Sequence, residues 1–346
     1  MRFTDIAIAG IGYELAPNVV TSEDLEARLA PVYQKLHIAP GQLAALTGIA
    51  ERRFWDADFR LSDGAVAAGR KALASGNISC AEIGMLVYGG VCRENLEPAT
   101  ACAVADGLGI APEAHLFDLS NACLGILNGM LQVANAIALG QIRAGLVVSC
   151  ESSRQIVDTT IERLNQSCDM ALFRDSIATL TGGSGAVAVV LSAASRAPHA
   201  PRLLGGVIRN ATRFHRLCTW GPDSGIPASG PLVMRTDSVG VLKHGVALGV
   251  DTYRDFIREM QWPADKPDKV ICHQVGSAHQ RTILESIGLD AASDFTTYRY
   301  LGNIGTVSLP ITAAIAAERE FLIPGDRVGF LGIGSGLNCI MLGVAW

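Results

Sequence analysis

The stretch Gly182-Gly-Ser-Gly-Ala-Val-Ala-Val-Val-Leu191 recurs in similar form as Ile333-Gly-Ser-Gly-Leu-Asn-Cys-Ile-Met-Leu342. In both copies a Gly-Ser-Gly turn leads into an apolar run of the length of a buried strand. The two turns lie at 183–185 and 334–336, an offset of 151 residues. Self-similarity at such an offset predicts a duplicated chain made of two similar halves.

Outward from these copies, short β-branched runs alternate with Ala-rich helical stretches, which is typical of an α/β protein. Strands are predicted at 5–10, 83–88, 145–150, 186–191, 268–272, 327–331 and 339–344. Helices are predicted at 63–75, 99–107, 123–138, 237–260, 278–287 and 308–320.

The two halves differ by an insertion. Strand 83–88 with helix 123–138 resembles strand 268–272 with helix 308–320 at an offset of about 185 residues, so the first half carries roughly 30 extra residues. The polar segment 152–181 is the candidate for this cap. We therefore predict an N-terminal domain over 1–196, with the cap at about 152–181, and a C-terminal domain over 202–346.

Composition excludes several classes of protein. The net charge is −5 and no Lys/Arg block occurs, which argues against a nucleic-acid partner. No apolar run reaches membrane-spanning length, and the start of the chain lacks the pattern of a signal peptide. The nine cysteines form no C-x-x-C pair, so most are expected to be buried thiols in a reducing compartment. A cytoplasmic protein is expected.

Common cofactor and metal motifs are missing from the sequence. It contains no P-loop, no G-x-S-x-G elbow and no H-E-x-x-H pair. Gly10-Ile-Gly12 begins like a dinucleotide fingerprint, but Leu15 stands where its third glycine would be. Cys272, His273 and His279 lack a further ligand at useful spacing. We therefore expect neither a cofactor nor a metal.

Three residues stand at strand-to-helix junctions. Cys123 begins the predicted helix 123–138, where the positive end of the macrodipole favours a thiolate nucleophile. His273 follows a buried strand, and Asn303 lies in a glycine-rich loop before another helix. A packed cysteine, a satisfied core histidine and a turn asparagine are the alternatives when each is taken singly. Their equivalent placement in two similar halves favours a shared site.

Five ordered motifs resemble the thiolase superfamily, and within it the β-ketoacyl-ACP synthase III-like condensing enzymes. They are Thr47-Gly-Ile-Ala-Glu-Arg-Arg53, Asn-Ala-Cys123, His273-Gln, Gly302-Asn-Ile-Gly305 and Gly334-Ser-Gly336, and they cover essentially the whole chain. The resemblance implies a five-layered αβαβα duplication and an acyltransferase with a Cys-His-Asn triad. Cys123 would take the first acyl group from an acyl-CoA.

The resemblance also implies the roles of the remaining groups. The backbone N–H groups of Cys123 and Gly336 would form the oxyanion hole. His273 and Asn303 would donate hydrogen bonds to the carbonyl oxygen of the second thioester. Neither role needs a metal.

Arg93-Glu-Asn-Leu-Glu97-Pro98 bears on the type of condensation. It is similar to a loop of the acyl-CoA-condensing thiolases of long-chain olefin pathways, whose glutamate reaches across a homodimer into the partner's site. A plain acyl-CoA must lose an α-proton, which requires a base, whereas malonyl-ACP loses CO₂ instead. The resemblance implies that Glu97 is this base; an exposed, solvated loop carboxylate is the alternative.

Two departures from synthase III point the same way. His273-Gln-Val-Gly276 replaces His-Gln-Ala-Asn, and Gly302-Asn-Ile-Gly305 replaces Gly-Asn-Thr-Ser. We therefore expect non-decarboxylative Claisen condensation of two fatty acyl-CoAs to a β-keto acid or β-ketoacyl-CoA. Decarboxylative condensation with malonyl-ACP, which would make acyl carrier protein a partner, is the alternative. The clusters Arg52–Arg53 and Arg209, Arg213 and Arg216 either contact CoA phosphates or form solvated surface.

Overall fold

The N-terminal half of the chain is built on a mixed sheet with strand order β1-β7-β6-β4-β5. The computed structural model describes residues 1–222, 232–262 and 266–346. The strands are β1 (Ile6–Leu15), β4 (Ile83–Gly89), β5 (His115–Leu119), β6 (Ala144–Glu151) and β7 (Gly185–Ala193). Every residue of β6 is buried, because helices cover both faces of the sheet.

The C-terminal half repeats this arrangement with strand order β11-β12-β13-β8. Its strands are β8 (Arg202–Asn210), β11 (Lys269–Cys272), β12 (Arg327–Gly334) and β13 (Asn338–Ala345). β7 lies antiparallel between β6 and β1, and β13 lies antiparallel between β12 and β8. The two similar sequence stretches thus occupy equivalent strands. A single β1–β8 pair, Ala7 with Arg202, joins the halves into one nine-stranded sheet.

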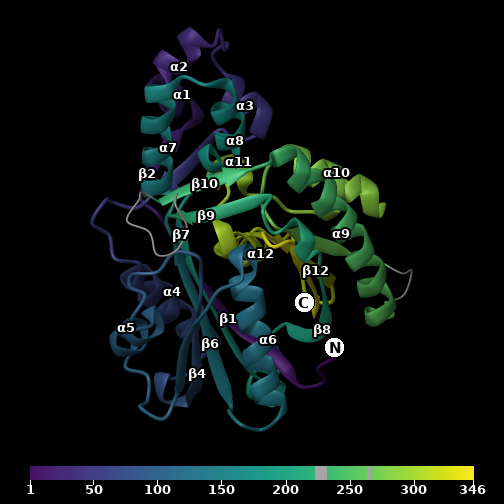
Figure 1. Cartoon of the computed structure of the whole chain (residues 1–346). Helices are drawn as coiled ribbons and strands as arrows, with labels where there is room; N and C mark the ends of the chain where they lie inside the picture. The colour runs from purple at the N-terminus through teal and green to yellow at the C-terminus, as the bar shows by residue number, and fades with distance from the viewer. Residues whose placement is uncertain (223–231, 263–265) are drawn as a thin grey trace.

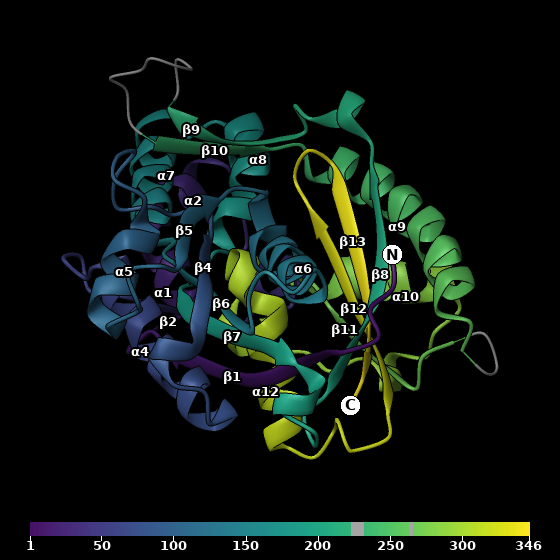
Figure 2. The same ribbon diagram turned by 90° about the horizontal axis from the view of Figure 1, so that it is seen from below.

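Helices complete five layers, as Figure 2 shows. The middle layer holds α6 (Gly125–Ala138) and α12 (Ser308–Glu318), whose apolar residues share one buried cluster with strands of both halves. One outer layer holds α4 (Leu61–Gly76) and α5 (Thr100–Leu108). The other holds α9 (Ser238–Met260) and α10 (Ser277–Ile287). The expected αβαβα architecture is confirmed.

A cap projects from the layered body at the top of Figure 1. It consists of α1 (Ser22–Arg28), α2 (Ala30–Lys35), α3 (Gln42–Thr47), α7 (Arg154–Ser167), α8 (Met170–Leu180), β2 (Asn18–Thr21) and β3 (Glu51–Phe54). Leu25, Val32, Val157 and Phe173 belong to its own buried cluster. The segment 152–181 therefore contributes two helices to this cap, and the N-terminal segment supplies the rest. The short elements β9 (Cys218–Pro222), β10 (Leu232–Thr236) and α11 (Tyr298–Leu301) lie beside it.

All seven predicted strands and all six predicted helices are present, with ends shifted by a few residues. One difference bears on the site: a 3-10 turn, Ala122–Leu124, precedes α6, which begins at Gly125. In the described part of the chain no helix is both long and apolar enough to cross a bilayer.

Candidate active site

Cys123 lies in the turn between the end of β5 and the start of α6. The close approach of α6 to β4 fixes this turn, because a Cβ at Gly125 would stand 2.6 Å from the carbonyl oxygen of Gly89. The N–H of Ile126, in the first turn of α6, donates to the Thr306 hydroxyl at 2.8 Å. One N–H of the helix end therefore already has a protein partner.

A cavity of about 150 Å³ brings the three predicted catalytic residues together, since Cys123, His273 and Asn303 all line it. Its remaining wall is mostly apolar, and most of it comes from α9, α10, β12 and β13, elements of the C-terminal half. The lining includes Gly245, Gly249, Ile283, Ile333 and Met341. The site thus joins a nucleophile from the first half to the imidazole and amide of the second.

The expectation of an anionic sulfur is wrong for this structure. Burial raises the pKa of the Cys123 thiol to about 12, and the nearby Cys218 and Glu151 add to the rise. Removal from water disfavours the thiolate more than the adjoining helix favours it. Cys123 therefore rests as a neutral thiol.

His273 follows β11, and its own N–H donates to the Leu331 carbonyl of β12 at 3.0 Å. Its Nδ1 lies 2.8 Å from the Oγ of Ser308, the first residue of α12. Burial, with a smaller effect of His279, lowers the pKa of His273 to about 4. The imidazole is therefore neutral at physiological pH.

Asn303 is held by the last residues of the segment 152–181 and the turn after it. Its N–H donates to the Thr181 carbonyl at 2.9 Å, and its carbonyl accepts from Gly183 N–H at 3.0 Å. Its side-chain Oδ1 accepts from Gly305 N–H at 3.1 Å. Because Oδ1 is occupied within its own loop, the Nδ2 group is the part of the amide available to a substrate in the cavity.

Gly336 lies on the turn between β12 and β13, with φ +132°. Among the described residues of this turn, Gly334, Ser335 and Leu337 line the cavity and Gly336 does not, so its oxyanion role stays a prediction. The Nδ2 group of Asn338 donates to Asn121 Oδ1 at 3.0 Å and to the Ser335 carbonyl at 3.3 Å. These bonds tie the Gly-Ser-Gly turn to the turn that carries Cys123.

Glu97 is exposed on the loop between β4 and α5, and the residue before it, Leu96, is 99% exposed. Within one chain Glu97 is not part of the cavity lining. Its predicted role therefore depends on a second copy of the chain.

Glu151, which is buried at the end of β6, belongs to no motif of the sequence. Its carboxylate accepts from Val91 N–H at 2.9 Å and from Cys92 N–H at 3.2 Å, at the start of the loop that carries Glu97. A Cβ at Gly305 would lie 3.4 Å from its Cδ, so it also packs against the Asn303 loop. Burial raises the pKa of this carboxyl. Glu151 therefore joins the loop that carries Glu97 to the loop that carries Asn303. The only sequence signal for it is a charged residue at the end of a predicted strand.

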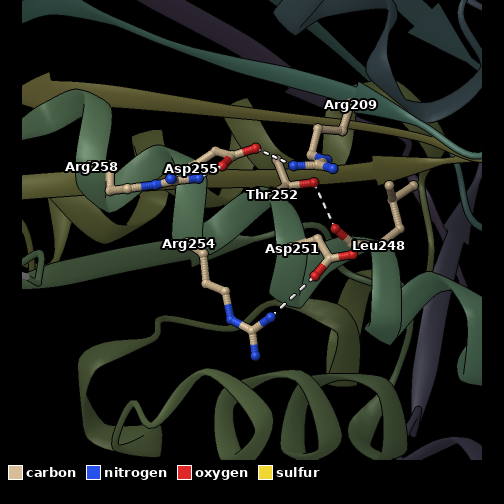
Figure 3. A network of polar contacts seen from close by, with 7 residues as sticks. All are labelled: Arg209, Leu248, Asp251, Thr252, Arg254, Asp255 and Arg258. Atoms are coloured by element: carbon tan, nitrogen blue, oxygen red, sulfur yellow. Dashed lines mark hydrogen bonds and ion pairs between the residues drawn. The ribbon is translucent and has the colours of Figure 1, made fainter.

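Several arginines of the two clusters have protein partners. Arg209 forms an ion pair with Asp255, which also pairs with Arg258 (Figure 3). Arg213 stacks over the Phe214 ring. Arg52 is fully buried and donates to the Ser22 hydroxyl at 3.1 Å. Of these residues, Arg209 and Arg52 are committed to protein contacts.

Family comparison agrees with the fold. Residues 117–207 match the family model for 3-oxoacyl-[acyl-carrier-protein] synthase III, and residues 257–346 match the model for its C-terminal part. The acyl-CoA:acyl-CoA alkyltransferase of Shewanella oneidensis is 51% identical over the full length of both chains. The chain therefore belongs to the synthase III-like family of acyltransferases, which has a thiolase-like fold.

More particularly, the chain is similar to enzymes that carry the alkyltransferase name. The acyl-CoA:acyl-CoA alkyltransferase of Xanthomonas campestris is 38% identical over the full length of both chains. A crystal structure of Xanthomonas campestris OleA, with a cysteine replaced by alanine, superposes with a TM-score of 0.94 at 37% identity, covering 100% of this chain and 98% of that one. Another OleA structure, with a cysteine-to-serine replacement, contains lauric acid and lauroyl-CoA; its TM-score is 0.93 at 37% identity, with 99% and 100% covered.

Proposed function

We propose that this acyltransferase joins two fatty acyl-CoA thioesters by a non-decarboxylative Claisen condensation through an acyl-Cys123 intermediate. The observation that carries the proposal is the single cavity in which Cys123, His273 and Asn303 meet against an apolar wall. The full-length similarity to acyl-CoA:acyl-CoA alkyltransferases supports the same reaction.

In the first half-reaction the sulfur of Cys123 attacks the thioester carbonyl of one acyl-CoA. The new carbon–sulfur bond replaces the bond to CoA, and the thiol proton leaves with CoA as its free thiol. Because the resting thiol is neutral, this proton must move as CoA departs. The N–H groups of the Cys123 turn and of the Gly-Ser-Gly turn would stabilise the oxyanion, with Gly336 as the predicted second donor.

In the second half-reaction the carboxylate of Glu97 takes an α-proton from the second acyl-CoA. The resulting enolate oxygen would accept hydrogen bonds from His273 and from Nδ2 of Asn303. Its carbon attacks the acyl carbonyl on Cys123, which leaves as the thiolate and is reprotonated. The product is a β-ketoacyl-CoA, which water can convert to the β-keto acid and CoA. These steps use only protein side chains and backbone groups, so we propose that no metal or cofactor takes part.

The acyl chain has an apolar place to bind. Residues of α9 and α10 and of β12 and β13 form much of the cavity wall. Gly245 and Gly249, one helical turn apart, keep side chains out of this space, and Ile283 and Ile333 face them. Burying methylene groups there contributes about 0.8 kcal/mol each to binding of a fatty chain.

A homodimer would bring Glu97 to the cavity of the partner. β5 is an edge strand of the nine-stranded sheet, and its Leu116 is 37% exposed. Leu96 is almost completely exposed beside Glu97. An apolar residue with this exposure fits an interface, and an open sheet edge fits pairing with a second copy.

The malonyl alternative is disfavoured at Gly276. Synthase III usually carries an asparagine at the matching position, but a Cβ at Gly276 would stand 2.8 Å from the Thr47 carbonyl oxygen. The backbone therefore leaves no room for that side chain. We propose a cytoplasmic enzyme of fatty acid, lipid or hydrocarbon biosynthesis that uses CoA rather than a carrier protein.

The test is incubation of the purified protein with a long-chain acyl-CoA alone. Release of CoA together with a β-keto acid, or the ketone formed when it loses CO₂, is the expected result. Activity that appears only after malonyl-CoA or malonyl-ACP is added would refute the proposal and favour the decarboxylative route.

A further inference from the structure

The hydrogen bond between His273 and Ser308 has a definite direction. Ser308 is fully buried, and its Oγ lies 2.8 Å from Nδ1 of His273. Within the described residues the structure gives the Ser308 hydroxyl no other hydrogen-bond partner. A buried O–H group without an acceptor costs about 1–3 kcal/mol, so the hydroxyl donates a hydrogen bond to Nδ1.

The direction of this bond determines the tautomer of the ring. The imidazole is neutral, because burial lowers the pKa of His273 to about 4. A neutral imidazole carries one proton, on either Nδ1 or Nε2. Since Nδ1 accepts from Ser308, the proton is on Nε2.

We propose that Ser308 is a positioning residue that holds His273 as the Nε2–H tautomer, so that His273 donates a hydrogen bond into the cavity and cannot act there as a base. This inference rests on the proposed condensation. It deepens that proposal by separating two roles: His273 stabilises the enolate, and a different group must take the α-proton.

These two roles are kept apart because the group beside Nδ1 of His273 is a hydroxyl and not a carboxylate. A carboxylate beside Nδ1 accepts a hydrogen bond from the ring N–H and leaves Nε2 unprotonated as a general base, as in serine proteases. A hydroxyl with the ring as its acceptor produces the opposite tautomer. With His273 as a hydrogen-bond donor, the exposed carboxylate of Glu97 takes the role of the base.

The tautomer can be observed directly by ¹⁵N NMR of the wild-type protein labelled at histidine. His273→Gln identifies the signals of His273 by difference. The expected spectrum at neutral pH shows a protonated Nε2 and an unprotonated Nδ1. A protonated Nδ1 in the wild type would overturn the inference, whatever the enzyme's activity.

Kinetics of Ser308→Ala, Ser308→Thr and Ser192→Ala give a second test. Ser192 is also fully buried, and among the described residues its hydroxyl bonds only to a backbone carbonyl on β7, so it controls for loss of a buried hydroxyl. Acylation of Cys123 is followed by intact mass, and condensation by product formation. Ser308→Ala should slow condensation about 10- to 100-fold, the usual effect of losing a partner that orients a histidine, and should leave acylation within about 2-fold.

The variants also separate this inference from the proposed function. Ser308→Thr, which retains the hydroxyl, should recover condensation, and Ser192→Ala should behave like the wild type. Equal loss of both steps in Ser308→Ala, or no loss in either, would overturn the inference. If the wild type itself makes no condensation product, the proposed function fails, and the NMR measurement still decides the role of Ser308.

Discussion

Replacing Gly249 by leucine should make the enzyme prefer shorter acyl chains. Gly249 is buried on α9 and lines the cavity opposite α10. A Cβ at this position would lie 2.8 Å from Cδ1 of Ile283, which also lines the cavity. Ile283 must then move its flexible end, which borders the same cavity. The leucine therefore narrows the cavity whether it points into it or displaces Ile283.

The loss of activity toward long substrates can be calculated from the part of the acyl chain that no longer fits in the cavity. A leucine side chain has the bulk of about four methylene groups, and if rotation of Ile283 accommodates half of it, about two methylenes of the substrate lose their place. Each buried methylene contributes about 0.8 kcal/mol to binding. The longest accepted substrate should therefore lose about 1.6 kcal/mol of binding free energy, which lowers its kcat/KM about 15-fold. Chains too short to reach Gly249 should react at the wild-type rate.

The assay is the release of CoA from a series of saturated acyl-CoAs of increasing length. Ala247→Leu is the matched control, because Ala247 is exposed on the same helix. Its length profile should equal that of the wild type. An unchanged profile in a folded Gly249→Leu enzyme would show that the acyl chain does not bind in the part of the cavity that Gly249 lines.

Three further outcomes are expected. Glu97→Gln should retain acylation of Cys123 and slow condensation by about 10²–10⁴-fold, the range for loss of a general base, and an unaffected condensation rate would remove Glu97 from the reaction. Alkylation of Cys123 by iodoacetamide should rise about tenfold per pH unit from about pH 7 to about pH 10, since the thiol pKa is about 12; a plateau below pH 8 would contradict this. Glu151→Gln should lower the pKa of Cys123 and speed alkylation at fixed pH, because the carboxylate of Glu151 raises that pKa. Slower alkylation of Glu151→Gln would contradict this effect of the carboxylate.

The layered body could be predicted from sequence because each of its strands and helices has a recognisable local pattern of residues. Each core strand is a short apolar run, and the Gly-Ser-Gly repeat marks two equivalent strands, β7 and β13. β8 was missed because Gly205 and Gly206 interrupt its apolar run, and β5 because it is a short, partly exposed edge strand. The polar helices α7 and α8 pack against the distant N-terminal segment, a contact that no local pattern reveals.

The catalytic residues could be located, but not their protonation states. Cys123 was expected to be a thiolate from its position before a helix. Its surroundings also depend on Cys218 of β9 and Glu151 of β6, which are remote in sequence. In the same way, Ser308 meets His273 only because α12 begins beside the end of β11. Long-range packing decides these pKa values and tautomers, and motif spacing carries no information about it.

Whether Cys123 carries the acyl group can be measured by intact mass spectrometry after a single addition of a long-chain acyl-CoA, followed by a second acyl-CoA labelled with ¹³C. We expect one acyl group on the wild-type chain, none on Cys123→Ala, and conversion of the acyl-enzyme to a mixed β-keto product on the second addition. An acylated Cys123→Ala chain, or a wild-type acyl group that the second thioester never removes, would contradict condensation through Cys123.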